Sequence, residues 1–342
     1  MMTADGERLG DGLDADRDAP PASTTPNAPR GQGRGRRPGP LGVVVALLVV
    51  VLVPVALTTE RFLTLANGRA ILASTAFVGI TAIGATLVMV SGSAVSLAVS
   101  QTATVVAMTF LATMEHGLGV AIIAGLAVGV AMTAVQGLVI GFWDANPIVL
   151  TIAAGFAITG VATWFSGGRP VYAESNAYDV LNRTVLGLPV AVYVLLAVTL
   201  LAQWVLRRTV VGRQMYLVGE NREAARAAGL PVGRVTVVAW AFFGGCIAVT
   251  GIFLAAFNTS ANVRLGGTLT LDAIAAVLVG GTAIAGGRGS ALRTLGGALL
   301  IAVIADVLLI RGYSTGAQIL VKGLLVLGVV VLVHIQATRG RR

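Results

Sequence analysis

The sequence predicts an all-α membrane protein, a polytopic transmembrane helical bundle of about ten spans with both termini in the cytoplasm. The composition is 56% hydrophobic and 11% charged, whereas soluble domains carry about 25% charged residues. The apolar runs are nearly continuous and reach the length of about 20 residues that a membrane-spanning helix needs. They do not alternate between apolar and polar residues as the strands of a membrane barrel do. Helices are therefore expected, since backbone polar groups in hydrocarbon need internal partners.

The expected transmembrane domain covers residues 41–336 and follows a cytoplasmic tail, residues 1–40. This tail is acidic, then rich in proline and alanine, then basic, so it could not bury a core and should be disordered. A short basic cytoplasmic tail, residues 337–342, ends the chain. The expected spans are 41–57, 68–90, 95–113, 118–140, 147–165, 188–206, 235–257, 271–286, 292–310 and 316–336.

The distribution of arginine predicts which segments face the cytoplasm. With ten spans, one set of segments holds both tails and most of the arginines, among them Arg207, Arg208 and Arg222, and the other set holds far fewer. Positive residues collect on the cytoplasmic side of membrane proteins. The largest cytoplasmic loop is then 207–234, and the largest external loop is 166–187.

Several function classes are disfavoured by residue usage. The net charge of +9 does not indicate nucleic-acid binding, because the positive residues sort by loop rather than forming one face. One cysteine and two separated histidines do not make a metal site. A nucleotide-binding P-loop needs lysine before serine or threonine, but the only lysine, Lys322, precedes Gly323. With no catalytic triad pattern either, we expect no enzyme activity, no metal and no cofactor of its own.

A short helix is expected inside the cytoplasmic loop. Asn221 can cap a helix over Arg222–Ala228, and Gly229 followed by Pro231 can end it. The helix is rich in alanine and lies between two spans. It could be a linker with no partner, or a coupling helix that docks into a groove on another subunit.

This loop and three further segments resemble one family of transporters. The pattern Glu223-Ala224-Ala225-x-x-x-Gly229 resembles the Glu-Ala-Ala loop of ATP-binding-cassette (ABC) importer permeases. Gly212–Ala225 is more specifically similar to the ribose/galactoside-type sugar permeases of the branched-chain amino acid/sugar permease superfamily. Three other segments are similar to the same family, namely Asn146–Thr151, Leu271–Ser290 and Gln318–Gly323. The resemblance covers about residues 65–335.

The resemblance implies the permease subunit of an ABC importer in the bacterial plasma membrane, for a monosaccharide or sugar-like solute, with 41–336 as its permease domain. Separate ATPase subunits would bind ATP, an extracytoplasmic solute-binding protein would deliver the solute, and two permease copies, identical or related, would form the path in the lipid bilayer. Transport would proceed by alternating access. The ATPase would dock on 207–234, through Gly219, Glu220, Asn221, Glu223, Ala224, Ala225 and Gly229.

Two alternatives remain open at this point. One is an ABC permease for branched-chain amino acids or nucleosides, which would share the architecture. The other is a self-contained secondary transporter, which would need ion-coupling carboxylates near mid-membrane. The family commonly has an acidic residue where this chain has Ser96, so the identity of the solute also stays open.

Polar and glycine residues near spans two, three and eight are candidates for a translocation path. Hydroxyl and amide groups suit an uncharged polyol, which needs weak, replaceable hydrogen bonds. Serines can instead bond between helices, and the glycines can form a turn. The candidate path residues are Ser91, Ser93, Ser96, Ser100, Gln101, Asn146, Gly280, Gly281 and Thr282.

The charged residues Asp306 and Lys322 both fall inside expected spans. Asp306 lies about five residues before Arg311, roughly 7–8 Å of helix, and Lys322 lies about six residues, roughly 9 Å, into the next span. Their depths match on antiparallel neighbours, and an unpaired charge in the membrane is costly. We therefore expect an intramembrane pair, with a polar lining of the external mouth as the alternative.

Overall fold

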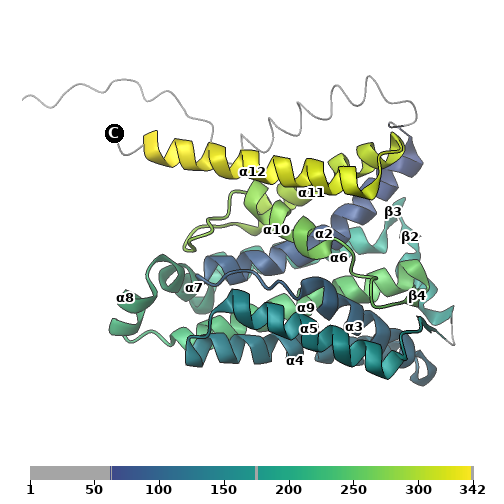
Figure 1. Cartoon of the computed structure of the whole chain (residues 1–342), viewed down its shortest axis with the longest axis horizontal. Helices are drawn as coiled ribbons and strands as arrows, with labels where there is room; N and C mark the ends of the chain where they lie inside the picture. Colours follow the sequence, from purple (N-terminus) through teal and green to yellow (C-terminus); the bar gives the residue numbers. More distant parts are fainter. Residues whose placement is uncertain (1–61, 63, 174–175, 340–342) are drawn as a thin grey trace, which may run out of the picture. The chain divides into compact units, whose positions relative to one another are not determined.

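The structure, a computed structural model, describes residues 62, 64–173 and 176–339, all of which lie within the unit 38–342. The expected tail 1–40 and first span 41–57 lie outside the described residues, as do residues 340–342 of the expected C-terminal tail. The main helices are α2 (Leu65–Val90), α3 (Val99–Ala112), α4 (Leu118–Trp143), α5 (Pro147–Ser166), α6 (Val190–Arg208), α7 (Val210–Glu220), α8 (Arg222–Ala227), α9 (Val232–Asn258), α10 (Leu269–Val279), α11 (Ala291–Ile310) and α12 (Thr315–Arg339) (Figure 1).

Six of the described helices are long and apolar enough to cross a membrane: α2, α4, α5, α6, α9 and α11. They coincide with the expected spans to within a few residues, because continuous apolar runs of this length can satisfy their backbone only as helices in hydrocarbon. Three shorter apolar helices are α3, α10 and the part of α12 from Thr315 to Gly328. The all-α, polytopic fold class is confirmed.

Two expected spans are shorter than predicted. The predicted span 95–113 becomes α3, which begins at Val99, and the predicted span 271–286 becomes α10, which ends at Val279. The 11 residues of α10 make a helix only about 16 Å long, roughly half the thickness of the hydrocarbon core. Just beyond its end, Gly281 has a φ of 75°, which is left-handed backbone that favours glycine.

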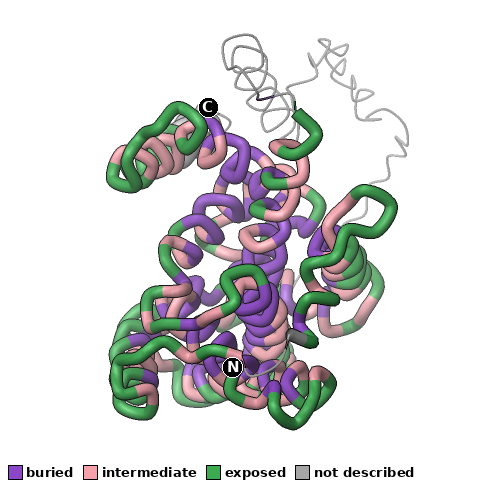
Figure 2. Tube along the Cα trace, turned by 90° about the vertical axis from the view of Figure 1, so that its right-hand side faces the viewer, coloured by how far each residue is buried: buried purple, intermediate pink, exposed green. Residues whose placement is uncertain are grey.

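The centre of the bundle is formed by α2 and α9. Within their most apolar windows, 72% of α2 and 61% of α9 is buried, against 22% of α4 and 17% of α5. Figure 2 shows this as buried stretches running through the trace, with exposed stretches at its periphery. Small residues allow close helix contacts: a Cβ added at Gly244 of α9 would collide with the Thr133 hydroxyl of α4.

Short strands and 3₁₀ turns occupy the loops. The strand β1 (Val171–Tyr172) pairs antiparallel with β4 (Ser260–Ala261), and β2 (Thr184–Val185) pairs with β3 (Leu188–Pro189). The 3₁₀ segments are η1 (Met114–His116) and η2 (Asn176–Asn182). The β1–β4 pair ties the predicted external loop 166–187 to the segment that follows α9, which places these two segments on the same side of the bundle.

Candidate functional site

The predicted short helix in the loop 207–234 is present as α8. The Asn221 side chain accepts a hydrogen bond from the Ala224 N–H at 3.0 Å, which satisfies a donor that the first turn leaves free. The helix ends at Ala227, and Gly229 follows with a φ of 76°. Glu223 and Ala224 are exposed, whereas Ala225 is buried. One side of α8 therefore faces outward and the other faces the protein.

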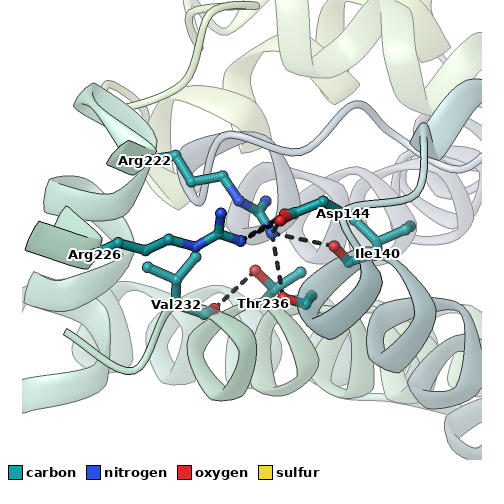
Figure 3. Close-up of polar contacts among 7 residues, drawn as sticks. Ile140, Asp144, Arg222, Arg226, Val232 and Thr236 are labelled. Atoms are coloured by element: carbon teal, nitrogen blue, oxygen red, sulfur yellow. Dashed lines mark hydrogen bonds and ion pairs between the residues drawn. The ribbon is translucent and has the colours of Figure 1, made fainter. Parts of the chain in front are cut away.

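Two arginines on α8 bind the C-terminal end of α4 (Figure 3). The Arg226 guanidinium donates to both Asp144 carboxylate oxygens, at 2.7 and 2.5 Å. Arg222 lies 2.9 Å from the same carboxylate and also donates to the backbone carbonyls of Ile140, at 3.1 Å, and Gly141, at 3.4 Å. Hydrogen bonding from Arg226, aided by the charge of Arg222, holds the pKa of the Asp144 carboxyl below its usual value.

The preceding helix, α7, contacts two other segments through glycine. We call Gly92, Gly219, Gly286 and Gly287 the glycine junction. A Cβ added at Gly219 would collide with the Val90 carbonyl oxygen and lie 2.6 Å from the Gly287 nitrogen, so backbone packs directly on backbone. The Gly287 N–H also donates to the Val90 carbonyl at 3.1 Å. The junction thus joins α7 to the end of α2 and to the turn before α11.

The glycine-rich block between α10 and α11 is mainly a tight turn. The Tyr216 hydroxyl of α7 donates to the Gly289 carbonyl at 2.9 Å, which adds a second link to the loop 207–234. A Cβ added at Gly280 would lie 2.8 Å from the Thr294 Cα, so this glycine packs on α11. Thr282 is buried as well, and its N–H donates to the Val277 carbonyl.

The polar residues between α2 and α3 divide into several contacts. The Ser91 hydroxyl donates to the Val88 carbonyl at 2.7 Å, and Ser96 donates to the Gln136 side chain at 3.2 Å. The Ser93 hydroxyl and the side-chain amide oxygen of Gln101 are buried with no hydrogen-bond partner among the described residues. Ser91 and Ser96 therefore make local or interhelical bonds, as one of the two sequence interpretations expected.

Asn146 lies apart from this group. It is exposed, and its side-chain oxygen accepts from the N–H groups of Ile148 at 3.0 Å and Val149 at 3.5 Å. This geometry makes it the N-terminal cap of α5, two residues beyond Asp144. Asparagine is a preferred capping residue at the start of a helix. This role accounts for an asparagine at position 146 without any contact to a solute.

Ser100 instead meets a residue that the sequence analysis did not select. The Ser100 N–H donates to the Thr270 hydroxyl at 3.0 Å, and the Thr270 N–H donates to the Ser100 hydroxyl at 3.1 Å. Each residue lies in the first turn of a short helix, where backbone N–H groups lack intrahelical partners. From this meeting point α3 runs toward β1 and β4, while α10 runs toward the glycine-rich turn before α11 (Figure 1).

The predicted pairing of Asp306 with Lys322 is wrong in this structure. The Lys322 ammonium on α12 lies 2.7 Å from Asp272 on α10, and both side chains are about nine-tenths buried. The Thr268 hydroxyl donates to the second Asp272 oxygen at 2.7 Å. Asp306 accepts instead from the Asn67 amide at 2.9 Å. Matching depths could not identify the partner, because α12 packs on both α10 and α11.

Two cavities adjoin this ion pair. Their volumes are about 190 and 270 Å³, and both are lined by Thr268, Asp272 and Lys322. The remaining lining is largely apolar and comes mostly from α2, α10, α11 and α12. Asp272 is the second residue of an expected span, so hydropathy places it at a membrane surface. Hydropathy therefore does not indicate that the Asp272 side chain is buried inside the bundle.

Comparison with known proteins identifies relatives over most of the chain. Residues 69–333 match the family described as "Branched-chain amino acid transport system / permease component". The chain is 33% identical over 299 residues to the "Probable ABC transporter permease protein YphD" of Escherichia coli, covering 87% of this chain and 89% of that one. It is 31% identical over 297 residues to the ribose import permease protein RbsC of Escherichia coli, covering 83% and 90%.

A third relative is the L-arabinose ABC transporter permease protein AraH of Azospirillum brasilense, 29% identical over 284 residues, which are 82% of this chain and 83% of that one. No solved structure matches the chain. The family match extends from α2 into α12 and so includes the loop 207–234, the glycine junction and the short helices α3 and α10. The chain therefore belongs to the branched-chain amino acid transport system permease family, as a multi-pass inner-membrane permease subunit of an ABC importer that is not itself an enzyme.

Proposed function

We propose that this permease imports a monosaccharide or sugar-like solute by alternating access, with ATP bound and hydrolysed by separate ATPase subunits. The support for a sugar is the naming of relatives for ribose and L-arabinose at 31% and 29% identity over more than four-fifths of this chain. A nucleotide-binding P-loop needs a lysine, and the only lysine of this chain, Lys322, is paired with Asp272 inside the bundle. This supports the binding of ATP by separate subunits.

The ATPase docks on α8, centred on Glu223 and Ala224. The observation that carries this assignment is the division of α8 into an exposed side and an anchored side, with Arg222 and Arg226 both bonded to Asp144. Of the other residues assigned to coupling, Asn221 and Gly229 define the ends of α8, Ala225 packs inward, and Gly219 and Glu220 join α7 to the glycine junction.

The chain crosses the membrane ten times, and both termini are cytoplasmic. Under this topology α3 and α10 are short helices that meet near mid-membrane, and span 41–57 supplies the first crossing. A second permease copy covers α4 and α5, whose apolar windows are only 22% and 17% buried. The solute-binding protein contacts the external side, where β1 pairs with β4.

The translocation path passes the meeting point of α3 and α10. Ser100 and Thr270 bring two hydroxyls and two helix N-termini to this point, and Gln101 adds an amide whose oxygen has no partner among the described residues. Such neutral groups suit a polyol. Ser96 and Gln136 lie on the route from this point toward the cytoplasm, and Gly280–Thr282 support α10 from the side of α11.

The function is tested by reconstituting the full chain with its ATPase and binding protein in proteoliposomes. We expect ATP-dependent uptake of radiolabelled ribose or arabinose and no uptake of leucine. Uptake of leucine alone would favour the amino-acid alternative, and uptake without ATP would favour a secondary transporter. The topology is tested by fusing a fluorescent protein to the C-terminus, which should fluoresce, and alkaline phosphatase within the loop 166–187, which should be active.

The docking surface is tested with Glu223→Arg. A charge reversal on the exposed side of α8 should weaken copurification of the ATPase and abolish transport while leaving the permease folded. The matched control is Arg288→Ala, which alters an exposed charge outside the docking loop 207–234, in the turn between α10 and α11. Intact association and transport in Glu223→Arg would refute docking through α8.

A further inference from the structure

We infer that Asp144 is a positioning residue that transmits movement of α8 to the cytoplasmic ends of α4 and α9, a role that rests on the proposed docking of the ATPase at α8. Asp144 lies between α4 and α5, 82 residues before Arg226 in the sequence. Its carboxylate binds Arg222 at 2.9 Å and Arg226 at 2.7 Å (Figure 3).

The contacts of Arg222 extend the connection from one side chain to the end of a helix. The last turn of α4 has no basic residue of its own, and Arg222 supplies one by donating to the carbonyls of Ile140 and Gly141. A cation at this position is favourable because the C-terminal carbonyls of a helix carry partial negative charge. Arg222 therefore binds the α4 backbone and the Asp144 carboxylate together. We call these contacts of Arg222 and Arg226 with the end of α4 the arginine clamp.

Without the arginine clamp, α8 would be joined to α9 mainly through a short bend. Residues 228–231 connect the two helices, and Gly229 occupies left-handed backbone with a φ of 76°. On its other side α8 follows α7 directly at Asn221, and Ala225 packs inward. The clamp adds an attachment to α4 at a distance from both connections, so that rotation of α8 displaces α4.

The end of α4 in turn moves with α9. A Cβ added at Gly141 would lie 2.8 Å from the Gly233 carbonyl, so the two helices are in direct backbone contact there. Asn146 begins α5 only two residues after Asp144 and fixes its first N–H groups. A displacement at Asp144 is thus passed to α4, α9 and the start of α5 at once.

The role of Asp144 should be visible in coupling more than in folding. The Asp144 and Arg226 side chains are 49% and 46% exposed, and exposed ion pairs contribute little to stability. Within the described part of the chain, the charges that face the Asp144 carboxylate are those of Arg222 and Arg226. Substituting Asp144 therefore removes the carboxylate contacts of the clamp, to Arg222 and Arg226, while leaving the buried contacts of the bundle in place.

The test compares Asp144→Ala, Arg226→Ala and the double variant in the complete reconstituted transporter. We expect transport per ATP hydrolysed to fall about fivefold or more in Asp144→Ala, with the double variant falling no further, because both changes break one connection. Asp144→Glu should retain coupling, and the control Arg288→Ala, an exposed charge outside the loop 207–234, should be unaffected. ATPase copurification should stay at the wild-type level throughout, which separates this outcome from failure of docking itself.

A second readout needs no solute. The one native cysteine, Cys246, is buried, so a thiol introduced by Trp143→Cys at the exposed end of α4 can be labelled selectively with a maleimide. We expect ATP with vanadate to change its labelling rate when Asp144 is present and to have no effect in Asp144→Ala. An unchanged response in Asp144→Ala, a further fall in the double variant, or loss of ATPase copurification in Asp144→Ala would overturn the inference.

Discussion

Ser100 and Thr270 each donate a backbone N–H to the other's hydroxyl, so the first turns of α3 and α10 satisfy one another across 170 residues of sequence. In neither helix does the side chain of the N-cap residue accept a bond from the first backbone N–H groups. Each hydroxyl therefore accepts a backbone N–H from the first turn of the other helix, whereas a capping side chain ordinarily accepts one from its own helix. It also holds together two helices that are each too short to cross the bilayer alone.

Removing one of these hydroxyls should destabilise both helix starts. Ser100→Ala or Thr270→Val should each lower the free energy of unfolding by about 1–2 kcal/mol, measured by thermal unfolding of the full chain in detergent. The double variant should lose less than the sum, because the two hydroxyls share one network. Thr270→Ser keeps the hydroxyl and should behave like the wild type, and strictly additive losses would argue against a shared network.

The ion pair between Asp272 and Lys322 should be sensitive to removal of one partner. Lys322→Met would leave a buried carboxylate without its cation, at an expected cost of about 3–5 kcal/mol. Asp272→Asn with Lys322→Met removes both charges and should be closer to wild-type stability. Thermal unfolding of wild type and both variants in nanodiscs measures this order. A double variant no better than Lys322→Met would show that α10 and α12 do not depend on the pair.

The glycine junction should tolerate no side chain at Gly219. A Cβ there collides with the Val90 carbonyl and the Gly287 nitrogen, and neither group is a flexible side chain that could move aside. Gly219→Ala should therefore sharply reduce the yield of folded protein, measured by fluorescence-detected size-exclusion chromatography. Gly68→Ala is the matched control in α2, because a Cβ added there meets nothing within 4 Å and alanine favours helix. A wild-type yield for Gly219→Ala would contradict the packing described for the junction.

The contribution of Asp144 to stability should follow its titration. Its pKa is lowered from 3.8, first by the hydrogen bond from Arg226, so the ion pair stabilises the folded state above that ordinary value and is lost as pH falls through the lower folded-state pKa. The difference in melting temperature between wild type and Asp144→Asn should be constant from about pH 5 to pH 8 and vanish in stronger acid. A difference that changes near pH 7 would point to another group.

The sequence predicted what depends on local pattern. The long spans follow from continuous apolar runs, and α8 follows from the capping residue Asn221 and the left-handed Gly229. The short length of α3 and α10 was not predicted, because hydropathy averages over a polar or glycine-rich turn and extends a span across it. Asp144 was missed for a different reason: its partners on α8 come close only after α4 and α9 pack together.

The pairing of Lys322 shows a limit of arguments from depth. Residue spacing placed the ammonium inside the bilayer, but several helices cross any one level, and only their packing decides which carboxylate is in reach. The segment 262–268 returns from the end of α9 toward the interior, so Asp272 lies in the first turn of α10 inside the bundle rather than at its edge. Hydropathy alone does not reveal such a return.

The contacts of the glycine junction do not depend on the exposed side chains of α8. Its contacts are made by backbone atoms of Gly219, Gly287 and Val90, so their chemistry is the same whatever side chains surround them. The exposed residues of α8, such as Glu223 and Ala224, take no part in those contacts. Substitutions at the outward-facing positions of α8 can therefore change the surface of this loop while the packing of α7 on α2 and on the turn before α11 stays the same.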